Sequence, residues 1–251
     1  MNCIDLPIDP TGQDQRTPRD WWHGQGVDDS AIDAYRLGFC PRCPMAVDPI
    51  HPERPMPSAT IPIYSATNTV LNIRHRLLRP PSKKGDKYRP HARDLGAHLF
   101  NTRSLGTLPD GTRRTDRRIA LIWEGEKKVI VGSSIQDWIL GFFYPIVTAT
   151  SGAGSWTSVY GDEWAAQFDE FERVIVMFDP GPDAILTAAE HTAALFGRRG
   201  CVIQTPQKVD DWLLGTAGGS GLTPTQRLDT LVGWIEDARP LRAESIWGGW
   251  A

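Results

Sequence analysis

The 251-residue sequence predicts an α/β protein whose mostly parallel sheet is flanked by helices and preceded by a smaller, basic α+β subdomain. Three observations predict this fold class. Four short apolar runs, "IALIW", "PIVTAT", "RVIVMF" and "GCVIQT", follow residue 117 and alternate with helical patterns, as in a parallel sheet covered on both faces. Before that point, alternating apolar and polar residues are typical of strands joined by a turn. Between Arg74 and Arg118 the chain carries 13 Lys plus Arg against 4 Asp plus Glu, a local net charge of +9.

Composition and the positions of turn-forming residues divide the chain into four segments. Residues 1–26 are polar, rich in Pro, Gly and Asp and without a sustained period, so we expect an irregular N-terminal arm. Residues 27–116 form the basic subdomain, and residues 117–215 form the domain with the parallel sheet. Residues 216–251 are expected to be a helical tail, because Leu228, Leu231, Val232 and Ile235 recur at helical spacing, with Thr223 or Thr225 as a cap and Pro240 as a terminator.

Within these segments, local patterns predict the individual elements. "DDSAIDAYRLGFC" predicts a short helix capped by its acidic start. "TIPIYSATNTVLNIRHRLL" predicts two strands around a polar turn, and its alternation places Arg74 and Arg76 on one face of the second strand. "RPPSKKGDKYRPHARD" predicts a basic loop, and "DAILTAAEHTAALFG" predicts a helix that ends at Gly197.

Several classes of protein are disfavoured by composition. No apolar run reaches the roughly 18 residues of a membrane span, and the N-terminus lacks a basic flank followed by an apolar core, so we expect a cytoplasmic protein without a membrane partner. Four cysteines are too few for a disulfide framework. Cys40 and Cys43 have the spacing of half a zinc site, to which His23 or His51 could add a ligand. The favoured interpretation is a loop turn in which both cysteines are reduced thiols.

Acidic residues follow the apolar runs of the predicted sheet. Glu124 follows "IALIW", Asp179 follows "RVIVMF", and Asp210 with Asp211 lies a few residues beyond "GCVIQT". Ligands of open parallel sheets bind beyond the carboxyl ends of the strands, so these carboxylates would form an oxygen-rich site for Mg²⁺ or Mn²⁺.

Three lysines lie beside the same carboxylates. Lys127, Lys128 and Lys208 could bind phosphate as point charges. The alternative for any single carboxylate, such as Asp183, is a plain position in the first turn of a helix.

These motifs resemble the TOPRIM fold of bacterial-type primases, topoisomerases and several nucleases. "IWEGEKK", "MFDPGPDA" and "KVDDWLL" occur in the family's order, and "AIDAYRLGFC", "IPIYSATNTVLNIRHRLL" and "GDKYRPHARDLGAHLFN" resemble the basic subdomain of primases from bacteria, phages and mobile elements. The resemblance implies that Glu124 is the catalytic glutamate, with Asp179 and Asp210 or Asp211 as metal ligands. It implies that Arg74, Arg76, Lys87 and Arg89 hold template or nucleotide phosphate, although a solvated surface is the plain alternative for these residues.

The chain departs from the TOPRIM pattern at one acidic position. Gly181 stands where the family has the second aspartate of its Asp-x-Asp motif, which leaves a reduced ligand set for two-metal polymerisation. Asp183 could compensate, but the Asp210 and Asp211 pair is the better source of charge. Gly152 and Gly154 are expected in a plain turn, with a role near phosphate as the alternative, and "DEWAAQFDEF" is expected to contribute packing rather than base stacking.

The resemblance implies a primase-like protein that binds single-stranded DNA and ribonucleoside triphosphates. It would make short RNA primers with Mg²⁺ or Mn²⁺ in the replication of a phage or mobile element. A replicative helicase is a further expected partner, with the helix near residues 223–238 as its candidate contact. Two alternatives stay open: a metal-dependent TOPRIM nuclease, and a non-catalytic DNA-binding module that serves a helicase or replisome.

Overall fold

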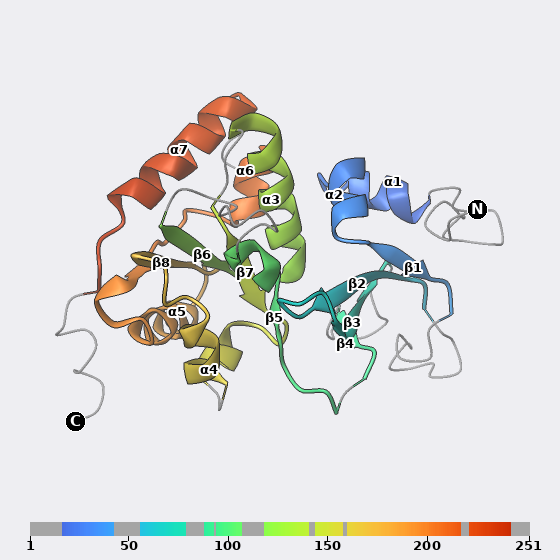
Figure 1. Ribbon diagram of the computed structural model, residues 1–251. Coiled ribbons are helices and arrows are strands. Elements are labelled where there is room, and N and C mark those ends of the chain that lie inside the picture. Colours follow the sequence, from blue (N-terminus) through green and yellow to red (C-terminus); the bar gives the residue numbers. More distant parts are fainter. Residues whose placement is uncertain are drawn as a thin grey trace. The chain divides into compact units, whose positions relative to one another are not determined.

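The computed structural model describes residues 17–42, 56–78, 88–92, 94–106, 118–140, 144–157, 160–216 and 221–241, without the side chains of residues 136–140. The chain divides into two compact units, an N-terminal unit Met1–Gly96 and a C-terminal unit Ala97–Ala251. Each unit is built around one sheet (Figure 1). Within the described ranges, no helix is both long and apolar enough to cross a membrane.

The N-terminal unit contains a four-stranded antiparallel sheet in the order β1-β2-β3-β4. The strands are β1 (Gly38–Cys40), β2 (Ser58–Tyr64), β3 (Val70–Leu77) and β4 (Tyr88–Pro90). The predicted pair of strands around a polar turn is therefore confirmed as β2 and β3. Along β2, Ala59, Ile61 and Ile63 are fully buried at every second position, which is the period of a strand with one face in the core.

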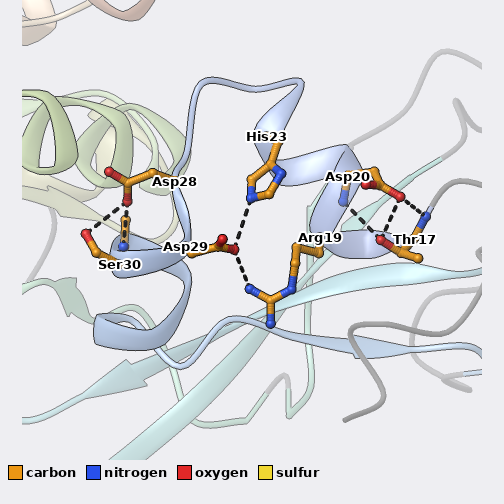
Figure 2. A network of polar contacts seen from close by, with 8 residues as sticks. Thr17, Arg19, Asp20, His23, Asp28, Asp29 and Ser30 are labelled. Carbon is orange, nitrogen blue, oxygen red and sulfur yellow. Dashed lines mark hydrogen bonds and ion pairs between the residues drawn. The ribbon is translucent and has the colours of Figure 1, made fainter. Parts of the chain in front are cut away.

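Two short helices accompany this sheet, α1 (Pro18–His23) and α2 (Asp29–Ala34). Figure 2 shows that Asp29 accepts hydrogen bonds from Arg19 and His23 of α1, so one carboxylate joins the two helices. The hydrogen bond from Arg19, followed by that from His23, holds the pKa of Asp29 below its usual value.

Helix α1 occupies residues that we expected to belong to an irregular arm. Its start has a recognisable signal, since Thr17 and Asp20 form a reciprocal capping box and Pro18 takes the first helical position (Figure 2). The helix is too short to show a period, but Trp22 is fully buried and anchors it. Residues 1–16 of the expected arm lie outside the described part of the chain.

The C-terminal unit contains a five-stranded sheet in the order β5-β7-β6-β8-β9. Strands β6 (Ile119–Trp123), β7 (Ile146–Ala149), β8 (Arg173–Met177) and β9 (Gly200–Val202) are parallel, which confirms the mostly parallel sheet. Strand β5 (Leu99–Phe100) pairs antiparallel with β7. The predicted basic subdomain, residues 27–116, includes these two residues, and so short a strand leaves no period in the sequence that would have separated them.

Helices cover both faces of this sheet (Figure 1). Helices α3 (Glu126–Leu140), α6 (Val209–Leu214) and α7 (Pro224–Asp237) lie on one side, and α4 (Gly161–Ala166) and α5 (Asp183–Ala194) lie on the other. Short 3₁₀ turns are formed by Thr102–Leu105, Ala153–Thr157 and Gly197–Arg199. On the side of α5, Trp156, Trp164, Phe168 and Phe196 form a buried aromatic cluster, so "DEWAAQFDEF" contributes packing as predicted.

The predicted tail helix is α7, and it packs on its own unit. Thr223 forms a capping box with Gln226, and Leu228, Leu231 and Ile235 are buried. At the other end, Arg173 donates hydrogen bonds to three carbonyl oxygens of residues 235, 236 and 238. The apolar side of the helix that we considered for a helicase contact is therefore used within the C-terminal unit.

Candidate functional site

The first two predicted acidic residues lie side by side at the carboxyl edge of the parallel sheet. Trp123 and Met177 are register partners at the ends of β6 and β8, so the residues that follow them are neighbours. The backbone N–H of Asp179 donates a hydrogen bond of 3.3 Å to Oε2 of Glu124. The glutamate is therefore held in place by the loop that carries the aspartate.

Lys128, from the first turn of α3, lies between these two residues. Its ammonium donates a hydrogen bond of 2.9 Å to the carbonyl oxygen of Glu124 and one of 2.8 Å to Oδ2 of Asp179. Both side chains of the ion pair are largely buried, with 12% of the Lys128 side chain and 17% of the Asp179 side chain exposed. The more exposed Lys208 places its Nζ 3.9 Å from the same Oδ2 atom.

Asp210 forms a second lysine-aspartate pair at the same edge. It lies in the first turn of α6 and is 2% exposed, and its Oδ2 atom is 2.7 Å from Nζ of Lys127. Its other carboxylate oxygen, Oδ1, is buried and has no hydrogen-bond partner within the described part of the protein. Lys127 and Lys128 are consecutive on α3, so one helix start reaches the acidic residues of two other elements.

Asp211 has a different contact from that of Asp210. Its Oδ1 accepts a hydrogen bond of 3.3 Å from the hydroxyl of Thr216, beyond the end of α6. Of the two aspartates that we considered together, Asp210 is thus the one joined to the start of α3, and Asp211 supports the end of its own helix.

The turn between β6 and α3 depends on two residues that the sequence reasoning did not single out. Gly125 has a φ of +90°, a conformation that favours glycine, and its N–H donates to the hydroxyl of Thr148 at 3.0 Å. Thr148 is 1% exposed near the end of β7. The glycine directly after the glutamate was a usable turn signal, but a threonine within an apolar run gave none.

A small pocket adjoins Asp179 on the side of α5. It has a volume of about 170 Å³. It is lined by the loop at Asp179 and Gly181, by side chains of α5 such as Ile185, and by Val202 at the end of β9 with the three residues that follow it. Gly181 thus lies on a wall of this pocket. Gly152, at φ +89°, has open space around it, which leaves both of our interpretations of that turn standing.

The predicted basic residues of the N-terminal unit divide between the two faces of its sheet. Arg74 and Arg76 lie on one face, where both guanidinium groups approach the ring of Tyr88, at 5.6 and 4.9 Å from its centroid. Arg76 also lies 5.3 Å from the ring centroid of Trp21, and its Nε is buried without a hydrogen-bond partner among the described residues. The guanidinium group of Arg76 therefore makes cation–π contacts with the rings of Trp21 and Tyr88.

Arg89 lies on the opposite face of the sheet from this pair. It is the register partner of His75, whereas Tyr88 is the partner of Arg76, and neighbouring residues of a strand alternate between faces. Lys87 and Cys43 lie outside the described residues, so the structure places neither one. Cys40 is half-buried at the end of β1.

The carboxylates have the chemistry that the implied Mg²⁺ or Mn²⁺ requires. Asp179 and Asp210 supply hard oxygen ligands, and the buried Oδ1 of Asp210 has an acceptor lone pair to offer. Among the described residues, however, no three Asp, Glu, His or Cys side chains are grouped closely enough to hold a metal. Mg²⁺ is commonly bound by one or two carboxylates together with substrate phosphates, and the residues fit a site of that kind.

Comparisons with known proteins give a consistent answer for the fold. No protein-family model matches the sequence, and no curated protein matches it. Among solved structures, the Escherichia coli primase catalytic core superposes with a TM-score of 0.60 at 15% identity, covering 98% of this chain and 78% of that one. A DnaG primase catalytic domain bound to single-stranded DNA gives 0.59 at 15% identity, covering 95% and 74%.

The primase fragment of the bacteriophage T7 primase-helicase protein is also similar, with a TM-score of 0.55 at 16% identity and coverage of 84% of this chain and 72% of that one. Bacterial and phage structures thus agree on one architecture. The TOPRIM primase resemblance is confirmed for the fold, and the chain has the fold of the DnaG-type primase catalytic core.

Proposed function

We propose that this chain is a primase-like protein that binds single-stranded DNA and joins ribonucleotides into a short primer during DNA replication in a phage or mobile element. The arrangement of Glu124, Asp179 and Lys128 at the carboxyl edge of the parallel sheet carries this proposal. The fold supports it, since two of the similar structures are a DnaG catalytic domain bound to single-stranded DNA and the primase part of a phage primase-helicase. By the same analogy, a replicative helicase is a proposed partner.

In this proposal, Glu124 accepts the proton of the attacking primer hydroxyl or orients the group that does. The Asp179 N–H fixes its carboxylate at one oxygen, which limits the directions in which that carboxylate can act. Asp179 and Asp210 would hold Mg²⁺ or Mn²⁺, which supplies charge neutralisation for phosphate oxygens when bound. Lys127, Lys128 and Lys208 would contact nucleotide phosphates, and Arg74 would contact the DNA backbone.

The test is primer synthesis on a single-stranded template with labelled ribonucleotides and Mg²⁺ or Mn²⁺. Removal of a general base typically lowers the rate by about 10²- to 10⁴-fold, and we expect a loss of that size for Glu124→Gln. Glu163→Gln, an exposed change of the same kind on α4, should retain full activity. Product that persists unchanged in Glu124→Gln would refute the catalytic assignment.

One observation favours a second function. Asp179 and Asp210 are each neutralised by a lysine of α3, which suits a site that binds nucleic acid or nucleotide without turnover. A non-catalytic module of this kind would bind single-stranded DNA in a salt-sensitive manner, unchanged by Asp179→Ala, and would make no primer. The same primer assay, run beside a DNA-binding titration, separates the two functions.

A further inference from the structure

The first turn of α3 carries two lysines where helix electrostatics disfavour them. The N-terminus of a helix has a partial positive charge, so cationic side chains there are destabilising unless another group offsets them. Here Asp210 offsets Lys127 at 2.7 Å, and Asp179 offsets Lys128 at 2.8 Å. Each pair joins α3 to a different element, so the two contacts are specific features of the tertiary structure rather than contacts within one helix.

The lysines engage the oxygens that a divalent cation would need. Oδ2 of Asp179 accepts from Lys128 and lies 3.9 Å from Nζ of Lys208, and Oδ2 of Asp210 is paired with Lys127. Like charges repel most strongly in a largely buried site, and both aspartates are largely or fully buried. A free cation that binds at either aspartate must therefore displace an ammonium group or bind beside it.

A nucleotide changes this balance, because its phosphates can accept the displaced lysines. We propose that Lys127 and Lys128 are exchangeable counter-ions, so that the site formed with Asp179 and Asp210 takes a divalent cation together with the phosphates of a nucleotide and binds the free cation poorly. Each ammonium moves from an aspartate to a phosphate oxygen as the cation takes its place at the aspartate. This inference rests on the proposed function for the location of the site, and it adds the order in which that site accepts its ligands.

The experiment measures two affinities of the full chain for wild type and Lys128→Gln. The first is for Mn²⁺ alone, measured by electron paramagnetic resonance without nucleotide. The second is for a non-hydrolysable ribonucleoside triphosphate analogue at saturating Mn²⁺, measured by fluorescence anisotropy. Coupling between two bound ligands typically changes affinity by about 5- to 150-fold, so we expect Lys128→Gln to bind Mn²⁺ about tenfold more tightly and the analogue about tenfold more weakly.

Three matched variants locate the effect. Lys128→Arg keeps the positive charge and should bind free Mn²⁺ as poorly as wild type does. Arg198→Gln removes one positive charge from an exposed position outside the site and should change neither affinity. Adding Asp179→Asn to Lys128→Gln should abolish the gain in Mn²⁺ binding, which would place the gained ion at Asp179.

The proposal predicts that the affinities for Mn²⁺ and for the analogue shift in opposite directions in one variant, because damage to the fold would weaken the binding of both ligands. Equal Mn²⁺ affinity of wild type and Lys128→Gln, or loss of both affinities in a variant with an intact circular dichroism spectrum and melting transition, overturns the proposal. If Lys128→Gln does not fold, Lys127→Gln gives the same two readouts at Asp210. Primer synthesis enters neither measurement, so a chain that shows both shifts but makes no primer keeps this inference and loses the proposed polymerisation.

Discussion

Gly181 stands where the TOPRIM pattern has its second aspartate, and its surroundings show what that change does. A Cβ atom at this position would lie 2.6 Å from Cδ1 of Ile185, so any side chain would first have to move the tip of that isoleucine. Asp183 does not restore the lost carboxylate, because it is an exposed residue in the first turn of α5, where acidic groups complement the helix dipole. The proposed metal site would therefore depend on Glu124, Asp179 and Asp210.

His75 is a second residue whose environment sets its chemistry. It is 2% exposed on β3, lies 3.1 Å from the hydroxyl of Ser58 through Nδ1, and lies 3.0 Å from Nδ1 of His91 through Nε2. Burial, followed by repulsion from His91, lowers the pKa of His75 to about 4. The folded chain therefore keeps this imidazole neutral at pH values where the unfolded chain protonates it.

This difference predicts acid sensitivity of the N-terminal unit. Between pH 6.5 and about 4 the unfolded state binds more protons at His75 than the folded state does. The contribution of His75 to the free energy of unfolding is therefore fully present above pH 6.5 and falls as the pH drops through that window. At 1.36 kcal/mol per pKa unit, the full loss is about 3 kcal/mol. Hydrogen exchange of β3 amides, corrected for the intrinsic pH dependence, should show it.

The control is a variant that cannot titrate at this position. His75→Asn should flatten the part of the pH dependence that is due to this residue, whereas His191→Asn, an exposed change on α5, should leave it intact. Identical pH profiles for wild type and His75→Asn would contradict the assignment.

At the scale of elements, the position of α3 over β6 decides where its two lysines lie. Gly132 packs directly on the Trp123 ring, since a Cβ atom there would overlap it and would lie 3.0 Å from Cδ1 of Ile146. Trp123 is fully buried at the end of β6, immediately before Glu124. The glycine thus permits the close approach of helix and strand on which the site is built.

Two glycine-to-alanine substitutions, one in contact with the Trp123 ring and one in open space, test this packing. Gly132→Ala should destabilise the chain by about 1–3 kcal/mol through overpacking. Gly233→Ala, in α7 with no atom within 4 Å of the added methyl group, should stabilise it by about 0.5–1 kcal/mol. Thermal unfolding of both variants gives the two signs. Equal effects would show that helix propensity, and not contact with Trp123, determines the cost at Gly132.

The elements that could be predicted from the sequence are those with a strong period. β2, β3 and the parallel strands β6 to β9 alternate or run apolar for several residues, and α5 and α7 repeat at helical spacing. Helix α1 and strand β5 are too short for any period, and their existence depends on tertiary packing, on Trp22 in one case and on β7 in the other. The capping box of Thr17 and Asp20 marks where a short helix could begin, but without a period it does not establish that helix.

The candidate site could be predicted by position but not by pairing. Acidic residues after parallel strands gather at one edge by topology alone, and Glu124, Asp179 and Asp210 are found there. Which lysine meets which aspartate depends on the rotation of α3 about its axis, and this rotation is set by Gly125 and Gly132 through contacts with Thr148 and Trp123. The same limit applies to Asp211. It is the next residue after Asp210 on α6, so its side chain leaves the helix in a different direction and accepts a hydrogen bond from Thr216.

At the scale of the whole molecule, charge is distributed unevenly along a chain of net charge −3. The excess of basic residues lies between Arg74 and Arg118, which spans parts of both compact units, while the remainder is acidic. If the chain binds DNA as proposed, long-range attraction of the DNA depends on this segment, since the acidic remainder repels phosphate. Binding should therefore be steeply salt-dependent although the protein as a whole is acidic.

The slope of that dependence counts the phosphate contacts. For single strands, log K falls with log salt concentration by about 0.7 per neutralised phosphate, so Arg74→Gln should reduce the slope by about 0.7 and weaken binding to all sequences alike. Arg198→Gln removes the same charge from an exposed 3₁₀ turn and should leave the slope unchanged. A parallel titration of Arg76→Gln is informative because this residue packs on Trp21 and Tyr88, so its loss should also lower the melting temperature. If Arg74→Gln and Arg198→Gln shift the slope equally, net charge rather than a contact at Arg74 governs binding, and the basic face of β3 is then a solvated surface.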